Sequence, residues 1–203
     1  MTLPSFSPVV GHEYQPRSDE PMPSRATCVV HKFGGTSLAD AACFRQVAKI
    51  VNALAEERRL IVVSAMAGVT DQLVRAVHVA GKRDLGYREI IADVGARHRR
   101  TIRELLPNEA ANRLCDVLQR DLTIIEEVLH VTTVLRGYSR NGLELVSGYG
   151  EVWSAQILAA LLREEHEDTE WLDAREVLTV VRNDTAADVA WPESHARAEA
   201  WVA

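Results

Sequence analysis

A lysine, two glycines and two hydroxyl side chains follow an apolar stretch near the N-terminus of the chain. Residues 29–37 read V-V-H-K-F-G-G-T-S. A β-branched apolar run favours a buried strand, glycines let backbone N–H groups approach an anion, and a helix that begins at a hydroxyl residue points its positive dipole end at the same place. Lys32 adds a full positive charge. These residue types suit a phosphate site, but an ordinary Gly-Gly turn between strand and helix uses them too, so both interpretations stay open.

The spacing of this segment differs from that of two common phosphate-binding motifs. Lys32 precedes Gly34 and Gly35, whereas the lysine of a G-x-x-x-x-G-K-[ST] loop follows its glycines. The G-x-G-x-x-G pattern of dinucleotide-binding folds is not present in the segment either. A phosphate site here therefore depends on the strand end, the glycine pair and Ser37 rather than on either motif.

Three polar residues elsewhere stand at expected element ends. Ser64 and Thr70 flank a loop of small residues, where hydroxyls and a helix N-terminus suit a substrate carboxylate. A turn hydroxyl at Ser64 and helix capping by Thr70 are the structural alternatives. Glu151 follows two glycines and precedes an apolar run, so we expect it in the first turn of a helix, where a glutamate often serves only the helix dipole.

Apolar periodicity predicts the elements that position the first segment. Residues 26–33 read as a strand, and Ser37 is the expected N-cap of a helix with an apolar face at three- and four-residue spacing. The members of that face are Phe44, Val47, Ala48, Val51 and Leu54. The apolar run 60–63 predicts a strand buried on both faces. A loop at 64–68 and a helix opened by Val69 or Thr70 follow, and this alternation predicts an α/β fold with a parallel sheet flanked by helices.

The second half of the chain is mostly helical in pattern. After a break at 81–86, two helix-favouring stretches separated by Pro107 predict a helical hairpin. Four arginines in the first stretch read as a solvated helix face, and Trp153 reads as a core or interface residue. The arginines are Arg97, Arg99, Arg100 and Arg103. The remaining predicted elements are a turn at 138–142, a helix over 151–162, strands at 169–172 and 177–181, and a helix from Pro192.

Composition and charge narrow the function classes. The chain has 203 residues and a formal net charge of −6, which argues against nucleic acid or an anionic membrane as a partner. Residues 1–25 hold five of the seven prolines, lack the pattern of a signal peptide and are expected to form a disordered leader. No apolar run approaches the length of a membrane span. Three cysteines without a C-x-x-C pair favour a reducing cytoplasm, and the seven histidines lack the spacing of a metal site.

Four segments of the chain resemble a known family. They are K-F-G-G-T-S, V-V-S-A-M-A-G-V-T-D, G-Y-G-E-V-W-S-A-Q-I-L and W-L-D-A-R-E-V-L, in that order over about 150 residues. They are similar to segments of the aspartokinases in the amino-acid-kinase family. Their sequences most resemble the kinase part of bifunctional aspartokinase/homoserine dehydrogenases. The resemblance implies a three-layer sandwich with a mainly parallel sheet, of which residues 26–203 form an incomplete N-terminal part. Asp173, in the fourth segment, is given a structural role at a strand end.

The resemblance also implies an activity and a set of site residues. Aspartokinases transfer a phosphoryl group from ATP, bound with Mg²⁺, to the β-carboxylate of L-aspartate, the first step toward lysine, threonine and methionine, and we expect a homo-oligomer. Lys32 would be catalytic, and the implied nucleotide-binding residues are Lys32, Phe33, Gly34, Gly35 and Ser37. Ser64, Thr70 and Glu151 would bind aspartate. The carboxylate nucleophile is already ionised at neutral pH, so the reaction requires no general base.

The resemblance ends near Val181. Three later segments of the aspartokinases, which complete the aspartate and nucleotide sites, do not occur before Ala203, so turnover by these residues alone is not expected. A catalytically inactive protein of the same fold, acting as a binding or oligomerisation module, is the main alternative. Another amino-acid kinase, such as a glutamate or carbamate kinase, is a third interpretation.

Overall fold

The computed structural model describes residues 28–54, 58–166, 168–182 and 187–202. The predicted leader, residues 1–25, and the first two residues of the predicted first strand lie outside these ranges. Within them, the first two strands form a parallel pair, β1 at Cys28–Phe33 and β2 at Arg58–Val63. Parallel strands require a crossover connection, which a helix provides here, and the predicted strand–helix–strand order is confirmed.

The two faces of the β1–β2 pair have different surroundings. The side chains on the covered face are Phe33, Ile61 and Val63, which pack against the hydrophobic core. Those on the open face are Val30, Leu60 and Val62, which are 59%, 45% and 41% exposed. The prediction that 60–63 is buried on both faces is therefore wrong. Side chains alternate across a strand, and the described helices that form the core pack against the other face.

A short 3-10 helix, η1 at Gly35–Leu38, leads into helix α1 at Ala41–Asn52. The N-cap of α1 is Asp40, whose Oδ1 accepts a hydrogen bond from the backbone N–H of Cys43 at 2.9 Å. This bond lowers the pKa of the Asp40 carboxyl. The prediction of Ser37 as the cap is wrong, because the chain first makes the 3-10 turn. The predicted apolar face is confirmed for Phe44, Val47, Ala48 and Val51, whereas Leu54 lies beyond the helix end.

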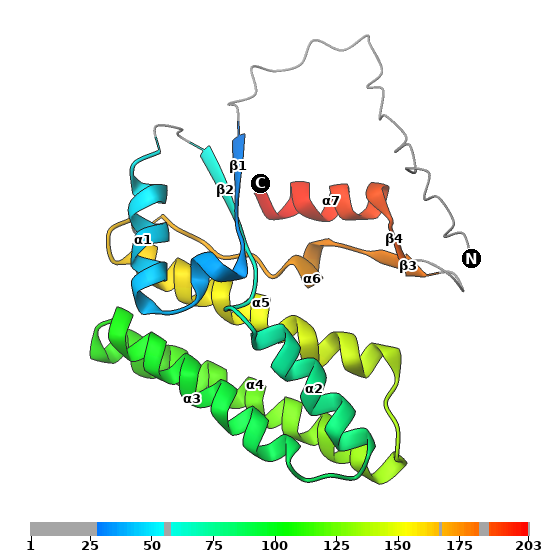
Figure 1. The fold of residues 1–203 in the computed structure, drawn as a ribbon. Coiled ribbons are helices and arrows are strands. Elements are labelled where there is room, and N and C mark those ends of the chain that lie inside the picture. Colours follow the sequence, from blue (N-terminus) through cyan, green and yellow to red (C-terminus); the bar gives the residue numbers. More distant parts are fainter. Residues whose placement is uncertain (1–27, 55–57, 167, 183–186, 203) are drawn as a thin grey trace, which may run out of the picture.

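Four helices form the body of the molecule. They are α2 at Val69–Gly81, α3 at Tyr87–Leu105, α4 at Asn108–Leu135 and α5 at Arg140–Arg163. Pro107 separates α3 from α4, which confirms the predicted hairpin. The two helices approach closely at Gly95, where an added Cβ would lie 2.7 Å from Cδ1 of Leu122. Figure 1 shows this hairpin and α2 below the β1–β2 pair, with α5 running above the hairpin.

Helix α5 is longer than the sequence pattern predicts. Its N-cap is Ser139, whose hydroxyl accepts a hydrogen bond from the N–H of Gly142 at 3.0 Å. The predictions of a turn at 138–142 and of a helix start at 151 are therefore wrong, because this cap starts the helix earlier and its glycines are accommodated inside it. By length and composition α5 is apolar enough to cross a membrane, contrary to expectation, yet more than half of its most apolar stretch is buried inside the fold. Its buried apolar residues belong to the core, and Trp153 is buried on it as predicted.

The C-terminal elements differ most from prediction. Residues 169–172 are irregular: the Thr169 N–H donates to the carbonyl of His166, just beyond α5, at 3.2 Å, and the Thr169 carbonyl accepts from Arg163, the last residue of α5. The predicted strand at 177–181 is confirmed only in part: a one-turn helix ends at residue 177, and the strand begins at residue 180. The observed elements are α6 at Ala174–Val177, β3 at Val180–Arg182, β4 at Ala187–Val189 and α7 at Trp191–Val202. β3 and β4 form an antiparallel hairpin separate from the β1–β2 pair, and α7 confirms the predicted C-terminal helix.

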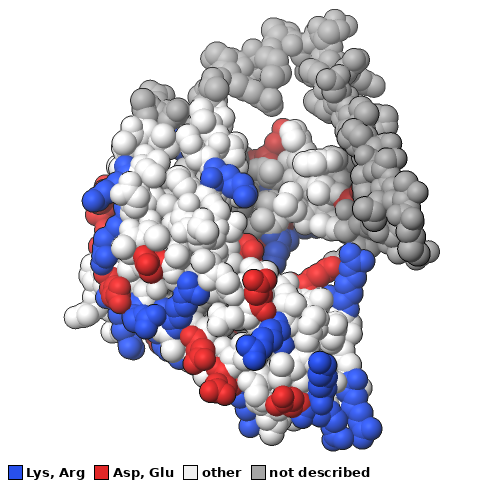
Figure 2. Space-filling view, in the orientation of Figure 1, with Lys and Arg blue, Asp and Glu red and all other residues white. Residues whose placement is uncertain are grey.

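Charge is mixed over the face of the molecule that Figure 2 shows. Acidic and basic side chains alternate across the helical part, and a largely uncharged area lies above it. Interspersed charges of both signs are typical of a solvated protein surface.

Candidate active site

The carboxyl ends of β1 and β2 meet at one edge of the sheet. The strand register pairs Lys32 with Val62 and Phe33 with Val63. The N–H of Ser64, the first residue after β2, donates to the Phe33 carbonyl at 3.1 Å. The predicted nucleotide segment and the predicted aspartate loop therefore leave the sheet side by side. In open α/β sheets, ligands bind outside the carboxyl ends of the strands.

The glycine pair shapes the first of these loops. Gly34 precedes η1 in extended conformation, and the Ser37 N–H donates to the Gly34 carbonyl at 3.0 Å. An added Cβ at Gly35 would lie 2.9 Å from the Ala65 carbonyl oxygen, so a side chain there would force the two loops apart. An added Cβ at Gly34 would have no heavy atom within 4 Å, which leaves its backbone accessible from that side. The side chain of Ser37 is exposed.

The second loop, residues 64–68, turns into α2 through a glycine. Gly68 is the N-cap of α2 and has φ +76°, a left-handed conformation that favours glycine. Thr70 lies in the first helical turn with a half-buried side chain, and Ser64 is half-buried as well. Because Gly68 occupies the cap position, capping by Thr70 does not account for this threonine. Both hydroxyls remain predicted ligands of a carboxylate.

Glu151 lies in the middle of α5, not in a first helical turn as predicted. A dipole role is therefore excluded, since that effect is confined to the helix ends. Its Oε2 is buried and has no hydrogen-bond partner among the described residues. The preceding residue, Gly150, packs on the second loop: an added Cβ would lie 2.7 Å from Cβ of Ala65 and 3.1 Å from Cγ1 of Val69. A buried carboxylate oxygen without a partner suits a cationic ligand.

Lys32 is exposed at the end of β1. Across the described ranges, no carboxylate forms an ion pair with it. Its ammonium is thus available to a ligand at this edge. The structure brings Lys32, the two glycines and Ser64 to one place, and joins Glu151 to them through Gly150 and Ala65.

Arg97 is a feature of the site that the sequence pattern missed. The prediction of a solvated arginine face is wrong for this residue, because its half-buried guanidinium donates to the carbonyls of Ala39 and Ala67, each at 2.8 Å. A signal was present in the periodicity. Arg97 lies three residues after Val94 and four before Thr101, two buried residues of the same helix face.

The fourth segment of the resemblance is attached to α5 by a charged cluster. Asp173 caps α6 by accepting from the Arg175 N–H at 3.0 Å, so its role is structural as expected, but at a helix start rather than a strand end. The Arg175 side chain bonds both Asp173 carboxylate oxygens and lowers the pKa of that carboxyl. The Arg175 guanidinium also lies 5.2 Å from the ring centre of Tyr149, two residues before Glu151.

Asp121 of α4 lies at the same cluster. Its Oδ2 accepts a hydrogen bond from Trp153 Nε1 at 2.9 Å. Burial raises the pKa of this carboxyl, although the Trp153 bond and the charges of Arg175 and Arg120 act in the opposite direction. When the pKa of a carboxyl is higher in the folded than in the unfolded protein, the protonated carboxyl favours folding. This stability is fully present below the unfolded-state pKa, near 4, and is lost as the pH rises through the folded-state pKa.

We therefore expect Asp121→Asn to gain stability relative to the parent as pH rises from about 3 to about 7, because the amide keeps an acceptor for Trp153 but carries no buried charge. Thermal melting of both proteins across this range measures the difference. Asp116→Asn, at an exposed position on the same helix, should show no such trend. A variant that falls further below the parent as pH rises would mean that the Asp121 charge is net favourable.

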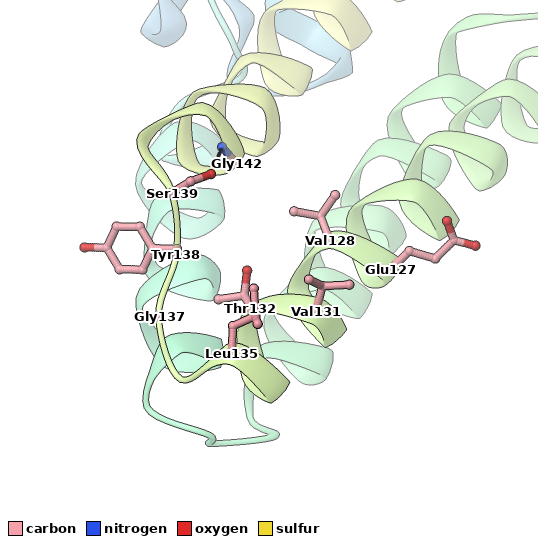
Figure 3. Close-up of a pocket in the computed structure, with 9 residues that line it drawn as sticks. All are labelled: Glu127, Val128, Val131, Thr132, Leu135, Gly137, Tyr138, Ser139 and Gly142. Carbon is pink, nitrogen blue, oxygen red and sulfur yellow. Dashed lines mark hydrogen bonds between the residues drawn. The ribbon is translucent and has the colours of Figure 1, made fainter.

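A cavity of about 300 Å³ lies away from these residues, at the corner between α4 and α5. Figure 3 shows its lining, which includes Val128, Val131, Leu135 and Tyr138 but none of the predicted site residues. In the described part of the chain, no group of three or more His, Cys, Asp or Glu side chains is arranged to hold a metal ion.

The parallel strand pair and the two loops that follow it lie in the part of the chain that matches a known protein family. Residues 27–192 match the model of the amino acid kinase family, and the chain belongs to that family. This match covers both strands, both loops and all of α5.

Within the family, the chain is similar to aspartokinases. It is 34% identical over 181 residues to the chloroplastic bifunctional aspartokinase/homoserine dehydrogenase 1 of Arabidopsis thaliana, which is 89% of this chain and 20% of that protein. It is 33% identical over 153 residues to the bifunctional aspartokinase/homoserine dehydrogenase 2 of Escherichia coli, covering 75% and 18%. The chain thus spans about a fifth of the length of these relatives.

A solved structure confirms the fold. Aspartokinase III of E. coli, in complex with aspartate and ADP, superimposes with a TM-score of 0.76 at 26% identity, over 87% of this chain and 38% of that one. The amino-acid-kinase architecture predicted from the resemblance is therefore confirmed, with the described elements forming a part of it.

Proposed function

We propose that residues 26–203 are the N-terminal part of the catalytic domain of an ATP-dependent aspartate kinase, which forms 4-phospho-L-aspartate. The observation that carries this proposal is the buried Oε2 of Glu151, which has no hydrogen-bond partner among the described residues and directly follows Gly150, the residue that packs on the second loop. Burying a carboxylate oxygen without a hydrogen-bond partner costs free energy. The α-ammonium of an amino acid can supply both the hydrogen bond and the opposite charge. The similarity to aspartokinases supports aspartate as that amino acid.

The two loops provide the other proposed ligands of aspartate and ATP. The hydroxyls of Ser64 and Thr70, with the N-terminus of α2, suit the substrate carboxylates. The N–H groups of Gly34 and Gly35 and the ammonium of Lys32 suit the phosphates of ATP, with Phe33 and Ser37 completing that segment. Mg²⁺, when bound with the nucleotide, neutralises phosphate charge.

The proposed reaction is a direct phosphoryl transfer. An oxygen of the aspartate β-carboxylate forms a bond to the γ-phosphorus, the bond from this phosphorus to the β,γ-bridging oxygen breaks, and ADP leaves. No proton has to move, because the nucleophile is already an anion. Lys32 stabilises the charge that develops on the transferring group, and the loops hold the two substrates in line.

We also propose a cytoplasmic homo-oligomer with no nucleic-acid or membrane partner. The net charge of −6 supports the latter. Cys28, Cys43 and Cys115 are free thiols, as a reducing compartment requires. The relatives to which the chain is similar include a chloroplastic and a bacterial enzyme.

An assay of the full-length protein tests the proposed activity. With ATP, Mg²⁺ and L-aspartate, we expect aspartate-dependent release of ADP and an acyl phosphate that hydroxylamine traps as a hydroxamate. L-Glutamate, one methylene longer, serves as the control substrate. Turnover of glutamate in place of aspartate would identify another amino-acid kinase. Binding of aspartate without any turnover would favour the non-catalytic module instead.

A further inference from the structure

One guanidinium group joins the two loops of the candidate site. Arg97 Nη1 donates to the Ala67 carbonyl and Nη2 to the Ala39 carbonyl, each at 2.8 Å. Ala39 directly follows η1, and Ala67 lies in the turn that leads into α2. The two carbonyls come from segments 28 positions apart in the sequence, while Arg97 itself belongs to α3.

The geometry requires an arginine. The planar guanidinium presents its two Nη atoms in a fixed fork, so both bonds form at once and set the separation of their acceptors. A lysine at the same position has a single nitrogen and would not hold both carbonyls in the same arrangement. The bonds are charge-assisted and the side chain is half-buried, which makes them stronger than exposed neutral hydrogen bonds.

The loops joined by Arg97 also touch each other. Gly35 of the first loop packs against the Ala65 carbonyl of the second, with no room for a Cβ between them. Gly150 packs against Cβ of the same alanine. Arg97 therefore acts on a tightly packed junction, where a small shift of one loop would move the other or separate the two.

We propose that Arg97 is a positioning residue that fixes the distance and angle between the nucleotide loop, residues 34–39, and the aspartate loop, residues 64–68. This inference rests on the proposed function. Arg97 touches neither substrate: it acts through the backbone of Ala39 and Ala67. Its contribution is to hold the transferring phosphoryl group in line with the attacking carboxylate.

The proposal makes a specific kinetic prediction. In the full-length protein, we expect Arg97→Ala to lower kcat about 10- to 100-fold, because a misplacement of about 1 Å between reacting groups has effects of this size. Each loop would keep its own ligand contacts, so the KM values for ATP and aspartate should each stay within about threefold of the parent. Arg97→Lys should not restore kcat, whereas added guanidinium at a concentration well below denaturation should partly restore that of Arg97→Ala.

Arg100→Ala is the matched control, since Arg100 lies on the same helix one turn further on and is exposed. It should leave kcat unchanged. An Arg97→Ala variant with the parent kcat, or one whose loss is matched by the control, would overturn the proposal. So would a variant that raises the KM of one substrate and leaves kcat unaltered.

Amide hydrogen exchange gives a readout that is independent of activity. In Arg97→Ala, residues 34–40 and 64–69 should both lose protection, while the α3–α4 hairpin keeps its protection and the melting temperature shows a folded protein. Unchanged exchange in either loop would overturn the proposal. If both loops lose protection but the parent protein does not phosphorylate aspartate, the loop-joining role of Arg97 stands and the proposed function fails.

Discussion

Replacement of Lys32 by alanine is expected to lower the rate of aspartyl phosphate formation by about a hundredfold or more, the usual effect of removing a group that stabilises transition-state charge. Lys32 lies at the end of β1 beside the glycine loop, is exposed and is unpaired within the described ranges. Its ammonium is thus available to the phosphoryl group. The hydroxamate assay on the full-length protein, at saturating ATP and aspartate, measures the rate.

Lys49→Ala provides the control for Lys32→Ala, because Lys49 is an exposed lysine in the last turn of α1. It should leave the rate unchanged. If Lys32→Ala stays within about threefold of the parent, the lysine is a solvated strand-end residue and the phosphoryl group is stabilised elsewhere.

The part of the site that the sequence predicts well is local in the chain. The first loop follows its strand directly, and the second follows β2, so the two apolar runs were enough to bring Lys32, Gly34 and Ser64 to one sheet edge. A parallel pair places both carboxyl ends at the same edge whatever the intervening helix does. The apolar face of α1 and the hairpin at Pro107 were also predicted from local sequence. The first depends on the spacing of apolar residues, and the second on a single helix-breaking proline.

The features that sequence reasoning missed depend on long-range contacts. The helix was predicted to start at 151, after the glycines at 148 and 150, yet α5 continues through both glycines. Gly150 allows close packing of α5 on Ala65, a contact that lies far away in the sequence. The spacing of Arg97 from Val94 and Thr101 indicates a position on the buried helix face, but no local pattern encodes its partners, which are carbonyls 58 and 30 positions away. The strand predicted at 169–172 did not form, and the one predicted at 177–181 formed only in part, as β3 paired with β4, because Val177 ends the α6 turn.

Because Glu151 lies inside α5 and not in its first turn, its substitution should affect ligand binding and not the helix dipole. We expect Glu151→Gln to raise the KM for aspartate about tenfold or more while the KM for ATP changes little, because a hydrogen bond to a charged group contributes about 1.5–3 kcal/mol. The amide keeps the shape of the side chain but loses the negative charge that suits an α-ammonium. Steady-state kinetics with each substrate varied in turn separates the two KM values.

A second readout distinguishes ligand binding by Glu151 from a purely structural role. Without a ligand, the buried Oε2 has no partner among the described residues, so replacing the carboxylate by a neutral amide should leave the melting temperature of the free protein unchanged or raise it. Added aspartate should then stabilise the parent more than the variant, because only a bound ligand shifts the folding equilibrium. Glu164→Gln, at the exposed C-cap of the same helix, should behave as the parent in both measurements. A larger effect of Glu151→Gln on the KM for ATP would instead assign this carboxylate to the magnesium–nucleotide side of the site.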